Sequence, residues 1–179
     1  MKKIYIYLIF FLSIIYIFSS KKTIKIAKAG YKLINKSIGS NNADEIINNL
    51  WLGNWISSTD RKFILNNNIK TIINVSKDLP FIDINDIVKY RIPVHDNYSL
   101  KTGLIIKKHL NNILDLIYNT IKNNNGVLVH CKAGSQRSAT VIAIYLIYKL
   151  NMNKNDCYKL IKMKRNIAFF PVPNYDKVL

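Results

Sequence analysis

Residues 127–140 read Val-Leu-Val-His-Cys-Lys-Ala-Gly-Ser-Gln-Arg-Ser-Ala-Thr. The apolar triplet at 127–129 predicts a short buried strand, and the largely apolar residues 138–150 predict a helix. Between them, five residues separate Cys131 from Arg137. The stretch is therefore a strand, a tight loop and a helix. Its cysteine lies at the carboxyl end of the strand, where open α/β sheets bind their ligands.

This strand–loop–helix order predicts an anion site. A loop wound just before a helix turns successive backbone N–H groups inward, and the helix N-terminus adds partial positive charge. The same field lowers the pKa of a thiol at the base of the loop, so we expect Cys131 to be a thiolate near neutral pH. Arg137 supplies a rigid fork that matches two phosphoryl oxygens, and Gly134 permits a sharp backbone path. The competing interpretation of Cys131 is a small buried hydrophobe.

The rest of the chain predicts an α/β fold with a central, mostly parallel sheet flanked by helices. Strands are expected at residues 50–53, 71–76, 88–92 and 127–129, and helices at 60–65, 104–122, 138–150 and 153–165. Cys157 falls on the apolar face of the last helix with Leu160 and Ile161, so we expect it to be a core residue.

The pattern His-Cys-x5-Arg-Ser at residues 130–138 resembles the signature of the protein-tyrosine-phosphatase superfamily. From about Ala43 to Leu179 the chain resembles the dual-specificity branch of that superfamily. The segments that carry this resemblance are 50–54, 73–75, 92–97 and 165–175. One departure is Gln136, which replaces the usual serine just before the arginine.

The resemblance implies a two-step mechanism. Cys131 would attack phosphorus and form a phosphocysteine. Asp96 would protonate the departing oxygen and then activate the water that cleaves the intermediate; the competing interpretation is a surface carboxylate. Ser138 would hydrogen-bond the sulfur, or serve only as a helix N-cap. The expected phosphate-binding residues are Lys132, Ala133, Gly134, Ser135, Gln136 and Arg137.

Two further residues near Cys131 receive expectations. His130 is expected to order the loop by hydrogen bonding without transferring protons. Lys132 points either into the pocket or to solvent, and the sequence leaves both open. No metal site and no cofactor are expected, because the two cysteines and three histidines lack ligand spacing.

The function that these features predict is that of a dual-specificity protein phosphatase acting on phosphotyrosine and phosphoserine or phosphothreonine. One alternative is a phosphatase of the same fold that acts on a phospholipid or an RNA phosphate. Lys-Ala-Gly after the cysteine also occurs in family members that act on such lipids, but a second basic residue at Ser135 or Gln136 is absent. Another alternative is a non-catalytic phosphate-binding module.

Composition adds little to this prediction. The 179 residues carry a formal net charge of +17, with 23 Lys and 4 Arg, and Ile, Asn and Lys are abundant throughout. This is the composition of an AT-rich coding sequence. Because arginines do not cluster with aromatic residues, no nucleic-acid partner is expected. Two cysteines do not make a disulfide framework and fit a reducing compartment.

The N-terminus predicts a membrane segment. Lys2 and Lys3 precede an apolar run at 4–18, interrupted only by Ser13, and six lysines follow it by residue 36. This positive-inside bias favours a membrane anchor with the catalytic domain facing the cytoplasm. A cleaved signal peptide, which would leave a soluble protein, is the alternative. The expected organisation is an anchor or signal segment at 1–20, a basic linker at 21–42 and a phosphatase domain at 43–179.

Overall fold

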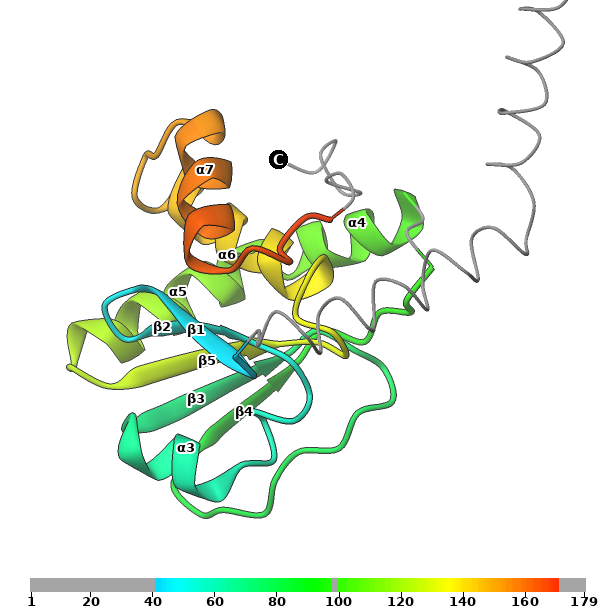
Figure 1. Ribbon diagram of the computed structural model, residues 1–179. Coiled ribbons are helices and arrows are strands. Elements are labelled where there is room, and N and C mark those ends of the chain that lie inside the picture. Colours follow the sequence, from blue (N-terminus) through cyan, green and yellow to red (C-terminus); the bar gives the residue numbers. More distant parts are fainter. Residues whose placement is uncertain (1–40, 98–99, 171–179) are drawn as a thin grey trace, which may run out of the picture. The chain divides into compact units, whose positions relative to one another are not determined.

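A five-stranded sheet with helices on both faces forms the folded body (Figure 1). The computed structural model describes residues 41–97 and 100–170. The spatial order of the strands is β1-β2-β5-β3-β4, with only the β1–β2 pair antiparallel. The strands are β1 (Ala43–Ile47), β2 (Leu50–Gly53), β3 (Ile69–Asn74), β4 (Val88–Arg91) and β5 (Gly126–His130). The predicted, mostly parallel α/β sheet is therefore confirmed.

The helices divide unequally between the two faces of the sheet, as Figure 1 shows. One face carries α3 (Arg61–Asn66), and the other carries α4 (Leu100–Lys108), α5 (Leu110–Lys122), α6 (Arg137–Tyr148) and α7 (Lys154–Lys164). Successive residues of β5 point to opposite faces. Leu128 accordingly joins a small cluster with Ile64 of α3, whereas Val127 and Val129 join the larger core under α5 and α6.

Helix α6 lies at the centre of the larger core. Its residues from Arg137 to Leu146 are all buried, because the helix packs against β2, β5, α5 and α7. A helix that is covered on every side has little freedom to shift. The first turn of α6, which begins at Arg137, therefore rests on rigid support.

The single helix predicted at 104–122 is wrong, because the structure has two helices that meet at His109. The His109 N–H bonds the Ile106 carbonyl at 3.0 Å, in a three-residue turn instead of the α-helical four. The His109 ring lies edge-on to Tyr90 of β4, with Nδ1 2.7 Å from the tyrosine hydroxyl. The break between α4 and α5 thus coincides with a hydrogen bond between His109 and the sheet. The apolar periodicity of the sequence continues across the break without interruption.

Strand β1 lacks a clear sequence signal, and we did not predict it. It forms a hairpin with β2 through Asn49, whose φ is 63°. Asparagine tolerates this left-handed conformation better than most residues. The Asn49 N–H also donates to the Glu45 carboxylate at 2.8 Å. A side chain of β1 thus stabilises the turn that β1 itself requires.

Most of the predicted N-terminal segments, residues 1–40, lie outside the described residues, as do residues 171–175 of the family resemblance. Asn41 and Asn42, assigned to the linker, bond to the folded body: the Asn42 carbonyl accepts from the N–H of Asn54 at 2.9 Å. Within 41–97 and 100–170, no helix has the length and apolar character needed to cross a membrane. The anchor and the domain boundaries remain predictions.

Candidate active site

Cys131 follows directly from β5, the middle strand of the sheet. It opens a segment that we call the Cys131 loop, residues 131–136, which ends where α6 begins. The Cys131 side chain is buried, and two donors reach its sulfur. The Ser138 hydroxyl lies 3.2 Å from Sγ, and the Gly134 backbone N–H lies 3.3 Å from it. Ser138 is thus in position for its predicted bond to the sulfur.

Burial and polar contacts act in opposite directions on this thiol. Burial raises the pKa of Cys131 and is the largest single influence. The Arg137 guanidinium, the hydroxyl and N–H of Ser138, and the Gly134 N–H all lower that pKa, and together they outweigh burial. The net pKa of the Cys131 thiol lies below its ordinary value, in the direction that the sequence predicts.

Four carbonyl groups of the Cys131 loop, those of residues 132–135, are bonded from outside the loop. The Lys132 carbonyl accepts from the N–H of Trp55 at 3.3 Å, and the Ser135 carbonyl accepts from the N–H of Phe169 at 2.7 Å. In a trans peptide the C=O and the N–H point in opposite directions. Each carbonyl that is bonded outward therefore leaves the next N–H directed to the inner side of the loop, where an anion would bind.

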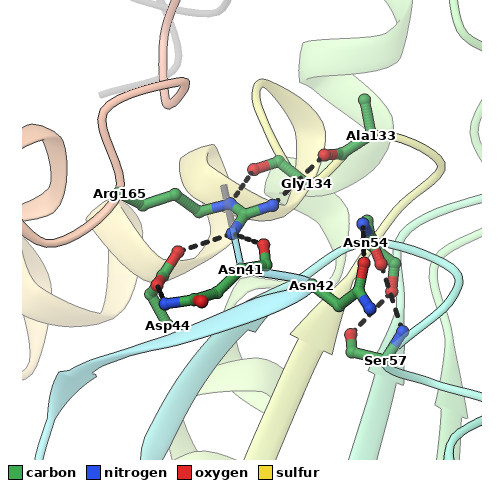
Figure 2. A network of polar contacts seen from close by, with 8 residues as sticks. All are labelled: Asn41, Asn42, Asp44, Asn54, Ser57, Ala133, Gly134 and Arg165. Atoms are coloured by element: carbon green, nitrogen blue, oxygen red, sulfur yellow. Dashed lines mark hydrogen bonds and ion pairs between the residues drawn. The ribbon is translucent and has the colours of Figure 1, made fainter. Parts of the chain in front are cut away.

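Arg165, just after α7, bonds the two remaining carbonyls of this set (Figure 2). Its Nε donates to the Gly134 carbonyl at 2.8 Å, and its Nη2 reaches the Ala133 carbonyl at 3.4 Å. Its Nη1 donates to the Asp44 carboxylate at 2.6 Å and to the Asn41 carbonyl at 3.0 Å. The outer side of the loop is therefore held by a buried ion pair.

Gly134 has the backbone conformation expected of it. Its φ is +69°, a region that residues with a Cβ rarely adopt. A Cβ at this position would also lie 2.5 Å from the Gly53 carbonyl oxygen, which is closer than real contacts allow. Both the turn and the close approach to β2 require glycine.

Arg137 and Asp96 meet at the mouth of the loop. Arg137 Nη2 lies 3.1 Å from Asp96 Oδ2, and the arginine side chain is 4% exposed against 45% for the aspartate. The Asp96 segment is itself supported, because the Val94 carbonyl accepts from the N–H of Lys77 at 3.1 Å. The structure therefore brings Asp96, predicted 35 positions before Cys131, to the same end of the sheet.

The chain offers other carboxylates near β4, but at the opposite end of that strand. Asp86 precedes β4 and lines an open groove of about 410 Å³ with Lys70 and Asn125. Because β3, β4 and β5 run parallel, this groove lies away from the carboxyl ends where Cys131 and Asp96 meet. The groove plays no part in the chemistry considered below.

The other predicted loop residues divide by exposure. Lys132 and Ala133 are exposed, whereas Ser135 and Gln136 are buried. The Gln136 side chain donates to the Phe170 carbonyl at 2.9 Å. The residue that departs from the family pattern thus holds the segment after α7 beside the loop.

His130 is fully buried. Neither of its ring nitrogens has a hydrogen-bond partner among the described residues, so the hydrogen-bonding role predicted for its ring is not seen. Burial lowers the pKa of His130 to about 4, and the charges of Arg91 and Arg137 act in the same direction. The ring is neutral at neutral pH and fills space behind the loop.

The comparisons with known proteins agree with this geometry. The family described as "Dual specificity phosphatase, catalytic domain" matches residues 50–179. Dual specificity protein phosphatase 9 of Homo sapiens is 35% identical over 135 residues, which cover 74% of this chain and 33% of that protein. The putative tyrosine phosphatase 123R of Invertebrate iridescent virus 6 is 33% identical over 126 residues, covering 70% of this chain and 81% of the viral one.

Among solved structures, the crystal structure of DUSP15 superposes with a TM-score of 0.68 at 30% identity, covering 77% of this chain and 85% of that one. The chain belongs to the dual specificity phosphatase family of the protein-tyrosine-phosphatase superfamily. Its match spans about a third of the length of phosphatase 9.

Sequence reasoning did not assign a role to Arg165 or Asp44. The contact between them joins residues 121 positions apart, and the contact from Arg165 to Gly134 joins residues 31 positions apart. A usable signal was nevertheless present. In a chain with 23 Lys and 4 Arg, an arginine marks a position where a fork of donors is needed and a point charge is insufficient.

We predict that His130 makes the fold less stable in mild acid. The unfolded state binds a proton near the ordinary histidine pKa of 6.5, but the folded state binds it only near pH 4. Stability must therefore fall as pH decreases through this window. When the pH is lowered from about 6.5 to 5, the His130 contribution should decrease the free energy of unfolding by roughly 1.5 kcal/mol, which urea titration can measure.

His130→Leu should remove this part of the pH dependence, because the apolar side chain replaces a ring without hydrogen-bond partners among the described residues. The matched control is His95→Gln, at an exposed histidine, and this variant should retain the pH dependence of the unfolding free energy. An unchanged pH slope in His130→Leu would contradict the assignment.

Proposed function

We propose that the chain is a dual-specificity protein phosphatase, a cysteine-dependent hydrolase of phosphotyrosine and of phosphoserine or phosphothreonine. The observation that carries the proposal is the placement of Cys131. Its sulfur accepts hydrogen bonds at the base of a loop in which the carbonyls of residues 132–135 are bonded outward, and Arg137 lies at the start of the following helix. A nucleophile of lowered pKa and an anion-binding loop thus share one site.

In the first step, the Cys131 thiolate attacks phosphorus while the bond from phosphorus to the leaving oxygen breaks. Inward N–H groups and Arg137 stabilise the charge on the three remaining phosphoryl oxygens. The leaving oxygen takes a proton from Asp96. When the phosphate dianion binds, it competes for the guanidinium that Asp96 now contacts.

In the second step, the Asp96 carboxylate takes a proton from water, and the water oxygen bonds to phosphorus. The sulfur–phosphorus bond breaks, which releases inorganic phosphate and restores the thiolate. The hydrogen bonds from Ser138 and Gly134 to Sγ stabilise the departing sulfur. The same two donors therefore favour the thiolate both as nucleophile and as leaving group.

Cys131→Ser should abolish turnover and retain binding of a phosphate ester, because the loop amides and Arg137 remain. Hydrolysis of an aryl phosphate and of phosphotyrosine and phosphothreonine peptides measures turnover, and calorimetry measures binding.

The control is Cys157→Ala, since burial raises the pKa of that thiol to about 12 and leaves it inert. Normal turnover by the serine variant, or loss of wild-type activity to a metal chelator, would contradict the thiolate mechanism. Faster cleavage of phosphoinositides than of phosphopeptides would favour the lipid alternative.

Asp96→Asn should slow cleavage of phosphopeptides by roughly 10²–10⁴-fold, the usual contribution of a positioned acid. A nitrated or fluorinated phenolate hardly needs a proton to leave, so activated aryl phosphates should be slowed far less. Rates over a series of leaving groups measure the difference. Asp83→Asn is the matched control, because Asp83 is exposed and precedes β4. Equal losses on all leaving groups would show that Asp96 only shapes its loop.

We also propose that the apolar run at 4–18 anchors the protein in a membrane, with the phosphatase domain on the cytoplasmic side. The excess of lysines after the run, six by residue 36 against Lys2 and Lys3 before it, supports this orientation. The full chain should sediment with membranes and resist carbonate extraction, whereas a chain that starts at Asn41 should not. Starting at Asn41 retains the bonds that Asn41 and Asn42 make. A mature protein that is processed near Ser20 would contradict the anchor and favour a signal peptide.

A further inference from the structure

We propose that Arg165 is a positioning residue that holds the Cys131 loop in its anion-binding form, and that Asp44 holds Arg165 in place. The inference deepens the proposed phosphatase function and rests on it. Arg165 comes from the end of α7 and Asp44 from β1, so neither belongs to the segment that forms the loop. Figure 2 shows the two side chains meeting on the outer side of Ala133 and Gly134.

The burial of Arg165 requires a specific role for its charge. Its side chain is fully buried, and that of Asp44 is 15% exposed. A guanidinium taken out of water is strongly destabilising unless it is paired and its donors are bonded. Asp44 neutralises the charge of Arg165. The backbone carbonyls of Asn41, Ala133 and Gly134 accept hydrogen bonds from the guanidinium. Two of these three acceptors belong to the Cys131 loop.

The two bonded peptides connect Arg165 to the reacting sulfur. In the peptide between Ala133 and Gly134, the carbonyl faces Arg165, and the N–H on the opposite side donates to Cys131 Sγ. In the next peptide, the Gly134 carbonyl accepts from Arg165, so the N–H of Ser135 is directed to the inner side of the loop. Arg165 therefore fixes the direction of two donors without touching the substrate.

The loop needs such a restraint at this position. Gly134 lacks a Cβ, so rotation of the peptides on either side of it meets little steric resistance. A rotated peptide would direct a carbonyl oxygen, which carries partial negative charge, toward the thiolate and the phosphate. Arg165 opposes this rotation because its charged donors bond both carbonyls in their outward direction.

A lysine could not replace this arrangement. Arg165 contacts acceptors through three separate nitrogen atoms that are fixed in one plane, whereas an ammonium group is a single point charge. The distinction provides a test that separates the forked geometry from the mere presence of a buried cation.

The experiment uses the full chain with four substitutions: Arg165→Met, Arg165→Lys, Asp44→Asn and the control Arg61→Met. Arg61 is an arginine that also bonds a backbone carbonyl, that of Asp83 at 2.7 Å, but it lies on α3 across the sheet. Alkylation of Cys131 by iodoacetamide is followed over pH, with and without inorganic phosphate. Peptide mapping distinguishes Cys131 from Cys157. The assay gives the thiol pKa and the phosphate Kd, and neither value depends on turnover.

Arg165→Met and Asp44→Asn should raise the thiol pKa by about 0.5 to 1, as expected from weakening one hydrogen bond to the thiolate. They should weaken phosphate binding about 10-fold, the loss expected from misdirecting one or two donors to an anion. Arg165→Lys should not restore either value, and Arg61→Met should change neither. In turnover of an aryl phosphate, the three variants should lower kcat/KM, while kcat falls less than KM rises.

Circular dichroism and thermal melting establish that each variant is folded at the assay temperature. Folded variants with an unchanged thiol pKa and phosphate Kd would overturn the proposal, since a purely structural role predicts lower stability alone. Full rescue by Arg165→Lys would also overturn it. If Arg165→Met does not fold, the thiol pKa and the phosphate Kd of Asp44→Asn decide instead, because that substitution only replaces a carboxylate oxygen by an amide nitrogen. A wild-type chain that binds phosphate but hydrolyses no phosphate ester would refute the proposed function and leave this inference to the alkylation data.

Discussion

The site depends on one constraint, which is that the carbonyls of residues 132–135 are all bonded on the outer side of the Cys131 loop. Trp55, Arg165 and Phe169 supply the donors, and they come from three separate parts of the chain. A carbonyl with an outward partner gains nothing by turning inward, so the N–H groups stay directed toward the anion. The loop is therefore organised before any phosphate arrives, and binding does not have to supply the free energy of ordering it.

Two arginines contact this loop from opposite sides, and each pairs with a carboxylate. Arg137 lies inside, where its charge lowers the pKa of Cys131, and pairs with the half-exposed Asp96. Arg165 lies outside, where Asp44 neutralises it. Only the inner arginine has an exchangeable partner, because a carboxylate at the surface can be displaced by a dianion at small cost. The outer pair is buried, and breaking it would be strongly destabilising. One pair can respond to substrate while the other remains fixed.

The sequence was informative wherever a local pattern determines the structure. The run before Cys131 predicts β5, and the turn that needs Gly134 has the predicted backbone. Prediction failed where the cause lies elsewhere in the chain. The break at His109 accompanies a bond to Tyr90 on another strand, and Arg165 acquires its role only when α7 is brought beside β1. His130 is a different case, since the described residues supply no hydrogen-bond partner to its buried ring, which departs from the usual pairing of buried polar groups.

The burial of the second cysteine has a consequence for redox chemistry. A thiolate with a lowered pKa is the form that peroxides oxidise, first to a sulfenic acid. Many proteins rescue this state by condensation with a neighbouring thiol. Cys157, the other cysteine of the chain, is fully buried on α7, and burial raises its pKa to about 12, so it is a poor resolving group. Oxidised Cys131 therefore depends on a thiol other than Cys157, or on condensation with a backbone nitrogen to a sulfenamide, to avoid the irreversible sulfinic and sulfonic acids.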